Sequence, residues 1–251
     1  MTFIPSLSGG GGAGGLGDLS TPPASPHAYD YEFEDDTLDA AWNITNQGTD
    51  GVSSATAGII STDLAPSDVH YELNTVRKSW MLIQPKLNER TVVTRAATVT
   101  TNMLIHARLK FNKKITSPIS NEGGIGLCFC ESNGSYADYG TNFAVCYINE
   151  SDGTIQVSVQ VQGTGSQGTT VNLANIATNI AQPWEYMAIH KLGTTIDFWV
   201  ACAGGNWQHV SRQTGITTSS NWDRIGFIAD APASAVAPEI PIVGCDYVRV
   251  I

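Results

Sequence analysis

Short apolar stretches, separated by clusters of Gly, Asn, Ser and Asp, cover the chain from residue 29 onward. The clearest one is 154–161, where Ile155, Val157, Val159 and Val161 alternate with polar residues. A period of two places successive side chains on opposite faces of a strand, so this stretch predicts a strand with one buried and one solvated face. Similar patterns predict strands at residues 79–84, 103–111, 124–130, 142–148, 154–161, 184–192, 195–201, 224–229 and 242–251.

The connections between these strands predict an all-β fold. Linkers 150–153 and 192–194 are short enough for hairpins, which join antiparallel strands. One short helix is predicted over 173–182, where the apolar residues follow helical spacing. No other segment is predicted to be helical. A parallel sheet needs helices that connect its strands, so the sequence does not favour one. The sequence predicts a two-sheet antiparallel sandwich.

The candidates for the apolar layer between the two sheets come from the predicted strands. They are Trp80, Leu82, Leu104, Ile105, Leu109, Leu127, Phe143, Phe198, Ile225 and Phe227. Because side chains alternate along a strand, only one of Leu104 and Ile105 can face this layer. We expect Ile105 to face it, together with Ala107 and Leu109.

Residues 1–28 differ from the rest of the chain, with seven glycines and four prolines. Such a segment buries too little apolar area to offset its backbone entropy, which favours a flexible tether. Large apolar residues nevertheless flank the glycines, namely Phe3, Ile4, Leu7, Leu16 and Leu19. Two interpretations follow: a disordered tail, or an extended arm that anchors the protein to a partner through these five side chains. The predicted domains are the arm at 1–28 and the sandwich at 29–251.

Charge is sparse and unevenly distributed. Charged residues make up 14% of the chain, and 13 Lys and Arg stand against 23 Asp and Glu. Residues 1–76 contain eleven of these acids and no Lys or Arg. Binding to a nucleic acid needs clustered cations that displace counterions, and this sequence has no such cluster. No apolar run reaches the length of a membrane-spanning helix, so membrane insertion is not expected either.

The five cysteines indicate the compartment in which the chain is made. Their odd number, with no secretory signal at the N-terminus, predicts free thiols and synthesis in a reducing host cytoplasm. Cys128 and Cys130 share one strand face, but the histidines show no ligand spacing. We therefore expect buried thiols, with no metal and no cofactor.

Several motifs resemble concanavalin A-like lectin and glucanase sandwich modules. The segment from Tyr31 to Trp42, with its acidic turn residues, resembles their opening strand and turn. Residues 184–201, followed by Gly204-Gly-Asn-Trp207, resemble their back-sheet meander, and 224–228 and 245–250 resemble their last two strands. The resemblance implies a jelly-roll sandwich over 29–251. It implies little about function, because this fold carries glycosidases, lectins and structural domains.

A glycosidase of this kind carries its acid pair in a Glu-x-Asp-x-Glu strand. The nearest match, Glu32-Phe-Glu-Asp-Asp36, departs from that order and lies before the first turn. We interpret it as a solvated strand face and turn. The glycines at 163–168 lie between two strand patterns, which predicts a hairpin loop rather than a nucleotide site. No catalytic residues are predicted.

A polar loop at 131–140 is the candidate ligand site. Its aromatic rings and acid, Tyr136, Tyr139 and Asp138, are the groups that stack on sugars and bind their hydroxyls. Glu131 and Asp138 are too sparse for a calcium loop.

Two functions are compatible with these features, and a third carries less weight. The main expectation is a non-enzymatic virion protein of a tailed bacteriophage, a decoration, head-fibre or tail component that the arm attaches to other virion proteins. A homotrimer is favoured, because three arms would bind with avidity; a cell-surface glycan is a further candidate partner. The alternative is a free carbohydrate-binding module or lectin. A degenerate glycoside hydrolase is the third.

Overall fold

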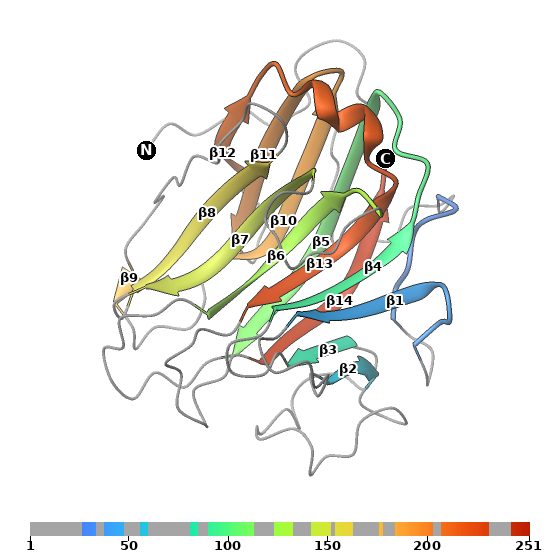
Figure 1. Cartoon of the computed structure of the whole chain (residues 1–251). Coiled ribbons are helices and arrows are strands. Elements are labelled where there is room, and N and C mark those ends of the chain that lie inside the picture. Colours follow the sequence, from blue (N-terminus) through green and yellow to red (C-terminus); the bar gives the residue numbers. More distant parts are fainter. Residues whose placement is uncertain are drawn as a thin grey trace.

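The computed structural model describes residues 27–33, 38–47, 56–59, 81–84, 90–112, 123–132, 142–151, 154–162, 176–177, 184–202, 207–230 and 242–251. These residues form two stacked antiparallel sheets, as the sequence predicts (Figure 1). Their only helical element is η2, a short 3-10 helix at Thr217–Asn221. The fold is an all-β jelly-roll sandwich.

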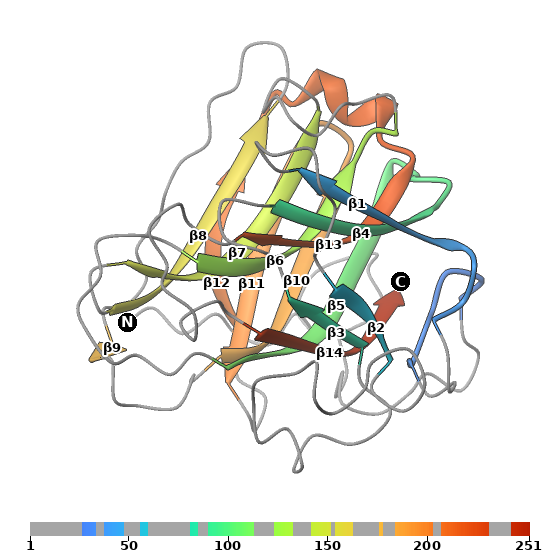
Figure 2. The ribbon, with the colours of Figure 1, turned by 60° about the horizontal axis from the view of Figure 1, so that its bottom comes forward.

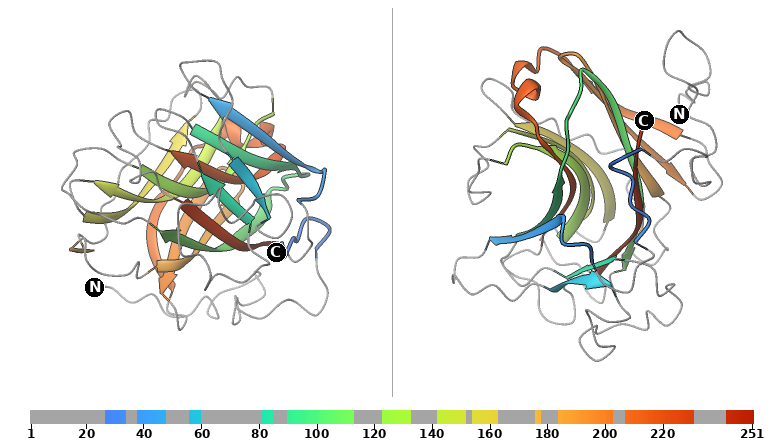
Figure 3. Two further views of the ribbon diagram at one scale, coloured as in Figure 1. Left: turned by 90° about the horizontal axis from the view of Figure 1, so that it is seen from below. Right: turned by 90° about the vertical axis from the view of Figure 1, so that its right-hand side faces the viewer.

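The front sheet has the strand order β1-β4-β13-β6-β7-β8-β9. Its strands are β1 (Trp42–Gln47), β4 (Arg90–Ala96), β6 (Gly123–Cys130), β7 (Phe143–Ser151), β8 (Thr154–Gln162), β9 (Ile176–Ala177) and β13 (Arg224–Asp230). This sheet is curved, and its concave side faces away from the other sheet (Figure 3, right).

The back sheet has the order β12-β11-β10-β5-β14-β3-β2. Its strands are β2 (Thr56–Ile59), β3 (Met81–Gln84), β5 (Asn102–Asn112), β10 (Trp184–Leu192), β11 (Thr195–Cys202), β12 (Trp207–Gln213) and β14 (Ile242–Val250). The short strands β2 and β3 lie beside β14, as Figure 2 shows. The hairpin of β10 and β11 matches the sequence prediction.

Both predicted hairpins are present. Ser151 pairs with Thr154 where β7 turns into β8, and Leu192 pairs with Thr195 where β10 turns into β11. Gly193 in the second turn has φ 60°, a conformation that glycine adopts without steric cost.

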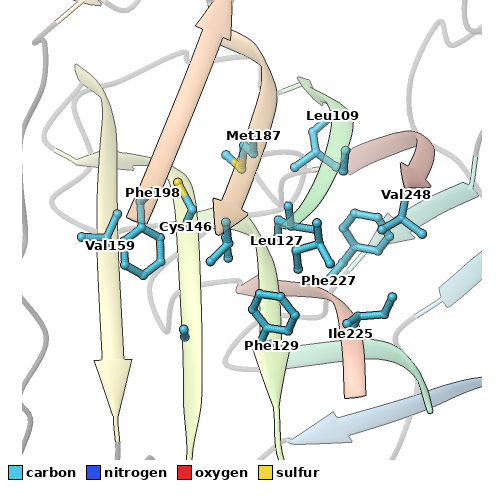
Figure 4. Packing of buried hydrophobic residues seen from close by; sticks show 14 of the residues in the cluster. Leu109, Leu127, Phe129, Cys146, Val159, Met187, Phe198, Ile225, Phe227 and Val248 are labelled. Atoms are coloured by element: carbon cyan, nitrogen blue, oxygen red, sulfur yellow. The ribbon is translucent and has the colours of Figure 1, made fainter. Parts of the chain in front are cut away.

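The sheets share one apolar layer, to which strands of both sheets contribute alternate side chains (Figure 4). On β5, Ile105, Ala107 and Leu109 point into this layer and are 0% exposed, which confirms the predicted face. Leu104 lies on the opposite face. The predictions for Leu127, Phe198, Ile225 and Phe227 are also confirmed.

The prediction for Phe143 is wrong. Phe143 is buried on the outer face of the front sheet, whereas its neighbours Ala144 and Cys146 face the inner layer. Both faces of β7 carry apolar residues, so their alternation does not show which face is the inner one. Trp80 lies outside the described residues, and Leu82 lies in β3.

Other predictions also need correction. Within the predicted helix 173–182, Ile176 and Ala177 form strand β9, which pairs with Thr154 and Ile155. The edge of β8 offers unpaired backbone groups that a short apolar segment satisfies by pairing. The sequence patterns also missed β1, β2, β4 and β12. Strand β4 has no alternation to detect, because Thr91, Val92, Val93 and Thr94 are all buried.

Residues 31–42, which resemble an opening strand and turn, are described at 31–33 and 38–42. Tyr31 forms a bridge to Val248 of β14, and strand β1 starts at Trp42. Between them, Phe33 is 0% exposed and has φ 52°, which is uncommon for a residue with a side chain. Its ring packs 5.3 Å from that of Trp42 and 6.1 Å from that of Phe227, so aromatic packing holds the chain in this conformation.

Glu32, for which the sequence analysis expected a solvated strand face, is 33% exposed and also takes part in an ion pair. Its carboxylate accepts two hydrogen bonds from the guanidinium of Arg249, at 2.6 and 2.7 Å. The Arg249 side chain is only 3% exposed, so this ion pair compensates a nearly buried charge. Beside it, the Asp30 carboxylate accepts the Val250 N–H at 2.7 Å. These contacts fasten segment 27–33 to β14.

We predict that Phe227→Ala lowers the free energy of unfolding by about 3–5 kcal/mol, because it opens a cavity in the shared layer. Leu192→Ala is the control, since Leu192 is 50% exposed. It should change stability by less than about 0.5 kcal/mol. Urea denaturation measures both variants, and equal midpoints would show that the inner face of β13 is assigned wrongly.

Candidate functional site

The outer face of the back sheet carries aromatic and charged side chains. In its central strands, Tyr186 of β10 lies opposite Arg108 of β5. The Tyr186 and Trp207 rings are 6.4 Å apart, and the Arg108 guanidinium lies 5.8 Å from the centre of the Tyr186 ring. Arg108 also forms a 3.1 Å ion pair with Asp246. We call Trp207, Tyr186, Arg108 and Asp246 the aromatic strip.

Members of the aromatic strip are accessible to solvent. Tyr186 and Trp207 are partly buried, and the Arg108 and Asp246 side chains are 31% and 18% exposed. Trp207 packs against a small outer cluster of Leu104, Ala188 and Trp199. The Trp207 ring is therefore held in place by the residues beneath it. An aromatic ring fixed in this way presents a flat apolar surface at little cost in conformational entropy.

Two buried ring nitrogens lie beside the aromatic strip. Ala188 of β10 pairs with Trp199 of β11 on one side and with His106 of β5 on the other. Trp199 Nε1 and His106 Nδ1 are both buried and have no hydrogen-bond partner. Burial, and then the charge of Arg249, lower the pKa of His106 to about 3, so its ring is neutral at physiological pH.

Asp197 is the centre of a charged network near the edge of the same face. Its carboxylate accepts two hydrogen bonds from Arg212, at 2.8 and 2.9 Å, and lies 2.9 Å from His209 Nε2. Burial alone would raise the pKa of Asp197, but the hydrogen bonds from Arg212 and His209 outweigh it and lower the pKa. The network joins β11 to the edge strand β12.

The outer, concave face of the front sheet is different, because its centre is apolar. A buried cluster covers it, formed by Val92, Cys128, Cys130, Phe143, Val145, Tyr147 and Ile228. A Cβ atom added to Gly126 would collide with the side chains of Val145 and Tyr147, so only glycine fits beneath them. Polar groups lie at one side of this face, where β8 contributes Ser158 and Gln160.

Four described cysteines are buried. Cys128 and Cys130 share one strand face, as predicted, and it is the outer face of the front sheet. Cys146 of the front sheet and Cys245 of the back sheet point into the inner layer. Burial raises the pKa of the Cys128 and Cys146 thiols, which keeps them protonated and unreactive. Within the described part of the chain, no three His, Cys, Asp or Glu side chains group as metal ligands would.

The predicted ligand loop joins β6 to β7 at one end of the front sheet. Tyr136, Asp138 and Tyr139 lie outside the described residues, but both ends of the loop are described. The Glu131 N–H donates to the Asn142 carbonyl at 3.1 Å, and Asn142 Nδ2 donates to the Glu131 carboxylate. The two ends of the loop are thus held together.

Asp223 fixes this loop base to the sheet. Its carboxylate accepts hydrogen bonds from both the backbone N–H and the hydroxyl of Ser132. Its backbone N–H donates to the Cys130 carbonyl at 3.1 Å, and its carbonyl accepts the Ala97 N–H at 2.8 Å. Next to it, Trp222 stacks on Phe129 with ring centres 5.6 Å apart. The loop therefore begins and ends on a rigid platform.

The other predicted functional residues are not brought together by the described structure. The arm residues Phe3, Ile4, Leu7, Leu16 and Leu19 lie outside the described residues, as do Glu34 and the glycines at 163–168. In the described part of the chain, no helix is both long and apolar enough for a membrane span. The sequence analysis missed the aromatic strip. Its signal was present in β10, where Tyr186, Ala188 and His190 alternate with Met187 and Ile189.

Comparison with known proteins identifies the fold. No protein-family model and no curated protein matches the sequence. Among solved structures, the Emp47p carbohydrate recognition domain has a TM-score of 0.57 and 9% identity, with 94% of this chain and 98% of that one covered. The VIP36 exoplasmic/lumenal domain, in its Ca²⁺/Man-bound form, has a TM-score of 0.56 and 10% identity, with 84% and 82% covered.

The GH43 protein BlXynB from Bacillus licheniformis is also similar, with a TM-score of 0.58 and 14% identity. The match covers 88% of this chain but only 39% of BlXynB. At these identities the similarity establishes the fold alone. The fold is a lectin-like two-sheet sandwich, which agrees with the fold that the sequence resemblance implies.

The lowered pKa of Asp197 predicts a pH-dependent contribution to stability. This contribution is present above the ordinary aspartate pKa of about 3.9 and is lost as the pH falls through the lower folded value. We therefore expect Asp197→Asn to destabilise the protein at pH 7 and to differ less from the wild type near pH 2. Urea denaturation at several pH values measures the difference in the free energy of unfolding between the variant and the wild type. Asp39→Asn is the control, because Asp39 is exposed. A constant difference would contradict the assigned network.

Proposed function

We propose that this chain is a carbohydrate-binding module of the lectin-like sandwich class. The main support is the extent of the structural match. The superposition with the Emp47p carbohydrate recognition domain includes almost the whole length of both chains. The VIP36 domain, similar over four fifths of both chains, has a mannose-bound form. The chain corresponds to only part of the GH43 protein. These relationships favour the module over a glycoside hydrolase.

The loop between β6 and β7 is the proposed contact region. Tyr136 and Tyr139 supply rings for stacking on a sugar, and Asp138 supplies a carboxylate for its hydroxyls. The Asp223 platform supports this assignment, because a loop with fixed ends loses less entropy when it orders around a ligand.

Calcium has no place in this proposal. VIP36 is known in calcium-bound forms, but the 131–140 loop of this chain has only two acids, Glu131 and Asp138. Glu131, at the loop base, is already hydrogen-bonded to Asn142. We therefore expect that a chelator leaves sugar binding unchanged.

Binding to immobilised neutral and charged oligosaccharides, followed by calorimetry on the best ligand, tests the proposal. We expect Tyr136→Ala and Asp138→Asn to weaken binding about tenfold or more, the effect of losing about 1.4 kcal/mol of contact energy. Asp39→Asn is the matched control, since Asp39 is exposed and lies in another segment. Failure of the intact protein to bind any glycan would refute the proposed function.

The virion role remains a prediction. It depends on composition and on the arm at residues 1–28, and almost all of this arm lies outside the described residues. The same holds for the favoured trimer and for the absence of catalysis. A glycan-binding sandwich is compatible with such a location.

A further inference from the structure

The aromatic strip has the chemistry of a sugar site and lies in the back sheet, not on the front-sheet loop. Tyr186 and Trp207 present two partly exposed rings, 6.4 Å apart, on strands that β11 separates. The C–H-rich faces of a pyranose pack against rings of this kind, because both surfaces are apolar and rigid. Arg108 and Asp246 lie beside the rings as a donor and an acceptor for hydroxyl groups.

The charges of this face indicate which ligands it suits. Arg108 is paired with Asp246, Arg212 with Asp197, and Arg249 with Glu32. Each of these three arginines therefore has an acid within 3.1 Å, and the three pairs make no net contribution to the charge. A polyanion binds clustered cations that are not already neutralised. A neutral ligand rich in hydroxyl groups complements this face better, and the formal charge of −10 on the whole chain also disfavours anions.

The unpartnered ring nitrogens are a second, independent observation. Trp199 is 6% exposed and His106 is 2% exposed, yet Trp199 Nε1 and His106 Nδ1 have no hydrogen-bond partner. A buried polar atom without a partner costs about 1–3 kcal/mol, which a hydrogen bond to a ligand or a water would recover. Other buried atoms of the described residues, such as Trp42 Nε1 and Trp222 Nε1, also lack a partner, but they do not belong to the outer face of the back sheet. Both atoms belong to the same outer face as Trp207, which packs on the Trp199 cluster.

We propose that the outer face of the back sheet is a binding site for a neutral oligosaccharide. Tyr186 and Trp207 stack on the sugar rings, and the Arg108–Asp246 pair binds their hydroxyl groups. Trp199 Nε1 and His106 Nδ1 lie beneath this face, and they gain a hydroxyl or water partner if side chains of the face move when the ligand binds. The inference takes its ligand class from the proposed function, but it places the contact on a different sheet from the 131–140 loop.

The test measures affinity for neutral gluco-, xylo-, manno- and galacto-oligosaccharides, with sulfated oligosaccharides as the anionic comparison. We expect Trp207→Ala and Tyr186→Ala to lose about tenfold or more in affinity. Leu192→Ala is the control, because it changes an exposed residue at the far end of the same strand, β10. It should bind like the wild type, and the sulfated ligands should bind more weakly than the neutral ones.

The outcomes separate this inference from the proposed function. If only Tyr136→Ala and Tyr139→Ala weaken binding, the back-sheet site is refuted and the proposed function stands. If the intact protein binds charged oligosaccharides but no neutral one, the back-sheet site is refuted and the proposed function stands. If it binds neither kind, both are refuted. Preference for the sulfated ligands also refutes the back-sheet site.

A second measurement covers the case in which Trp207→Ala does not fold. The intact chain is labelled with 5-fluorotryptophan, and the Trp207 resonance is assigned with Trp207→Phe. On titration with the best neutral oligosaccharide, this ¹⁹F resonance should shift in a saturable way. An unchanged Trp207 resonance at saturating ligand would refute the site.

Discussion

The alternation of side chains across each strand is the constraint on which the rest of this structure depends. In β5, Ile105, Ala107 and Leu109 fill the layer between the sheets, so Leu104, His106 and Arg108 have to face outward. The same geometry in β10 turns Met187 and Ile189 inward and Tyr186 outward. A shift of one residue in either strand would bury Arg108 or Tyr186 in the core. The composition of the outer face is therefore fixed by the packing of the inner one.

The two outer faces of the sandwich differ in the side chains that they carry. The front sheet is apolar at its centre, and Gly126 lets the side chains of Val145 and Tyr147 close over the strand beneath them. The back sheet instead carries rings and paired charges. Segment 27–33 contributes to this second surface, because Glu32 neutralises Arg249. In lectin-like sandwiches the fold does not by itself determine where a ligand binds, so each face has to be judged by its residues.

The sequence predicts the strands that alternate clearly, and it fails where alternation is absent. Strand β8 has one apolar and one polar face, and its prediction is confirmed. Strand β4 is buried on both faces and contains buried threonines, so no period was detectable. Phe143 was assigned to the wrong face because β7 is apolar on both sides. At 173–182 the spacing of apolar residues predicts a helix, but Ile176 and Ala177 pair with the edge of β8 instead.

The candidate site was harder to predict than the fold. Loop 131–140 was chosen for its composition, but its support by Asp223 comes from a residue about ninety positions away. The aromatic strip combines residues from four strands, β5, β10, β12 and β14, which only the sheet order brings together. Ion pairs such as Arg212–Asp197 depend on cross-strand register, and no local pattern in the sequence encodes that register.

Hydrogen–deuterium exchange of the intact chain, with and without a saturating neutral oligosaccharide, tests the central claim most directly. If the back sheet binds the sugar, amide exchange should slow in peptides that cover Trp184–Leu192 and Trp207–Gln213. Exchange in Gly123–Cys130 and Phe143–Ser151, which flank the front-sheet loop, then serves as the internal comparison. Slowing confined to the front-sheet strands, with β10 and β12 unchanged, would contradict the account.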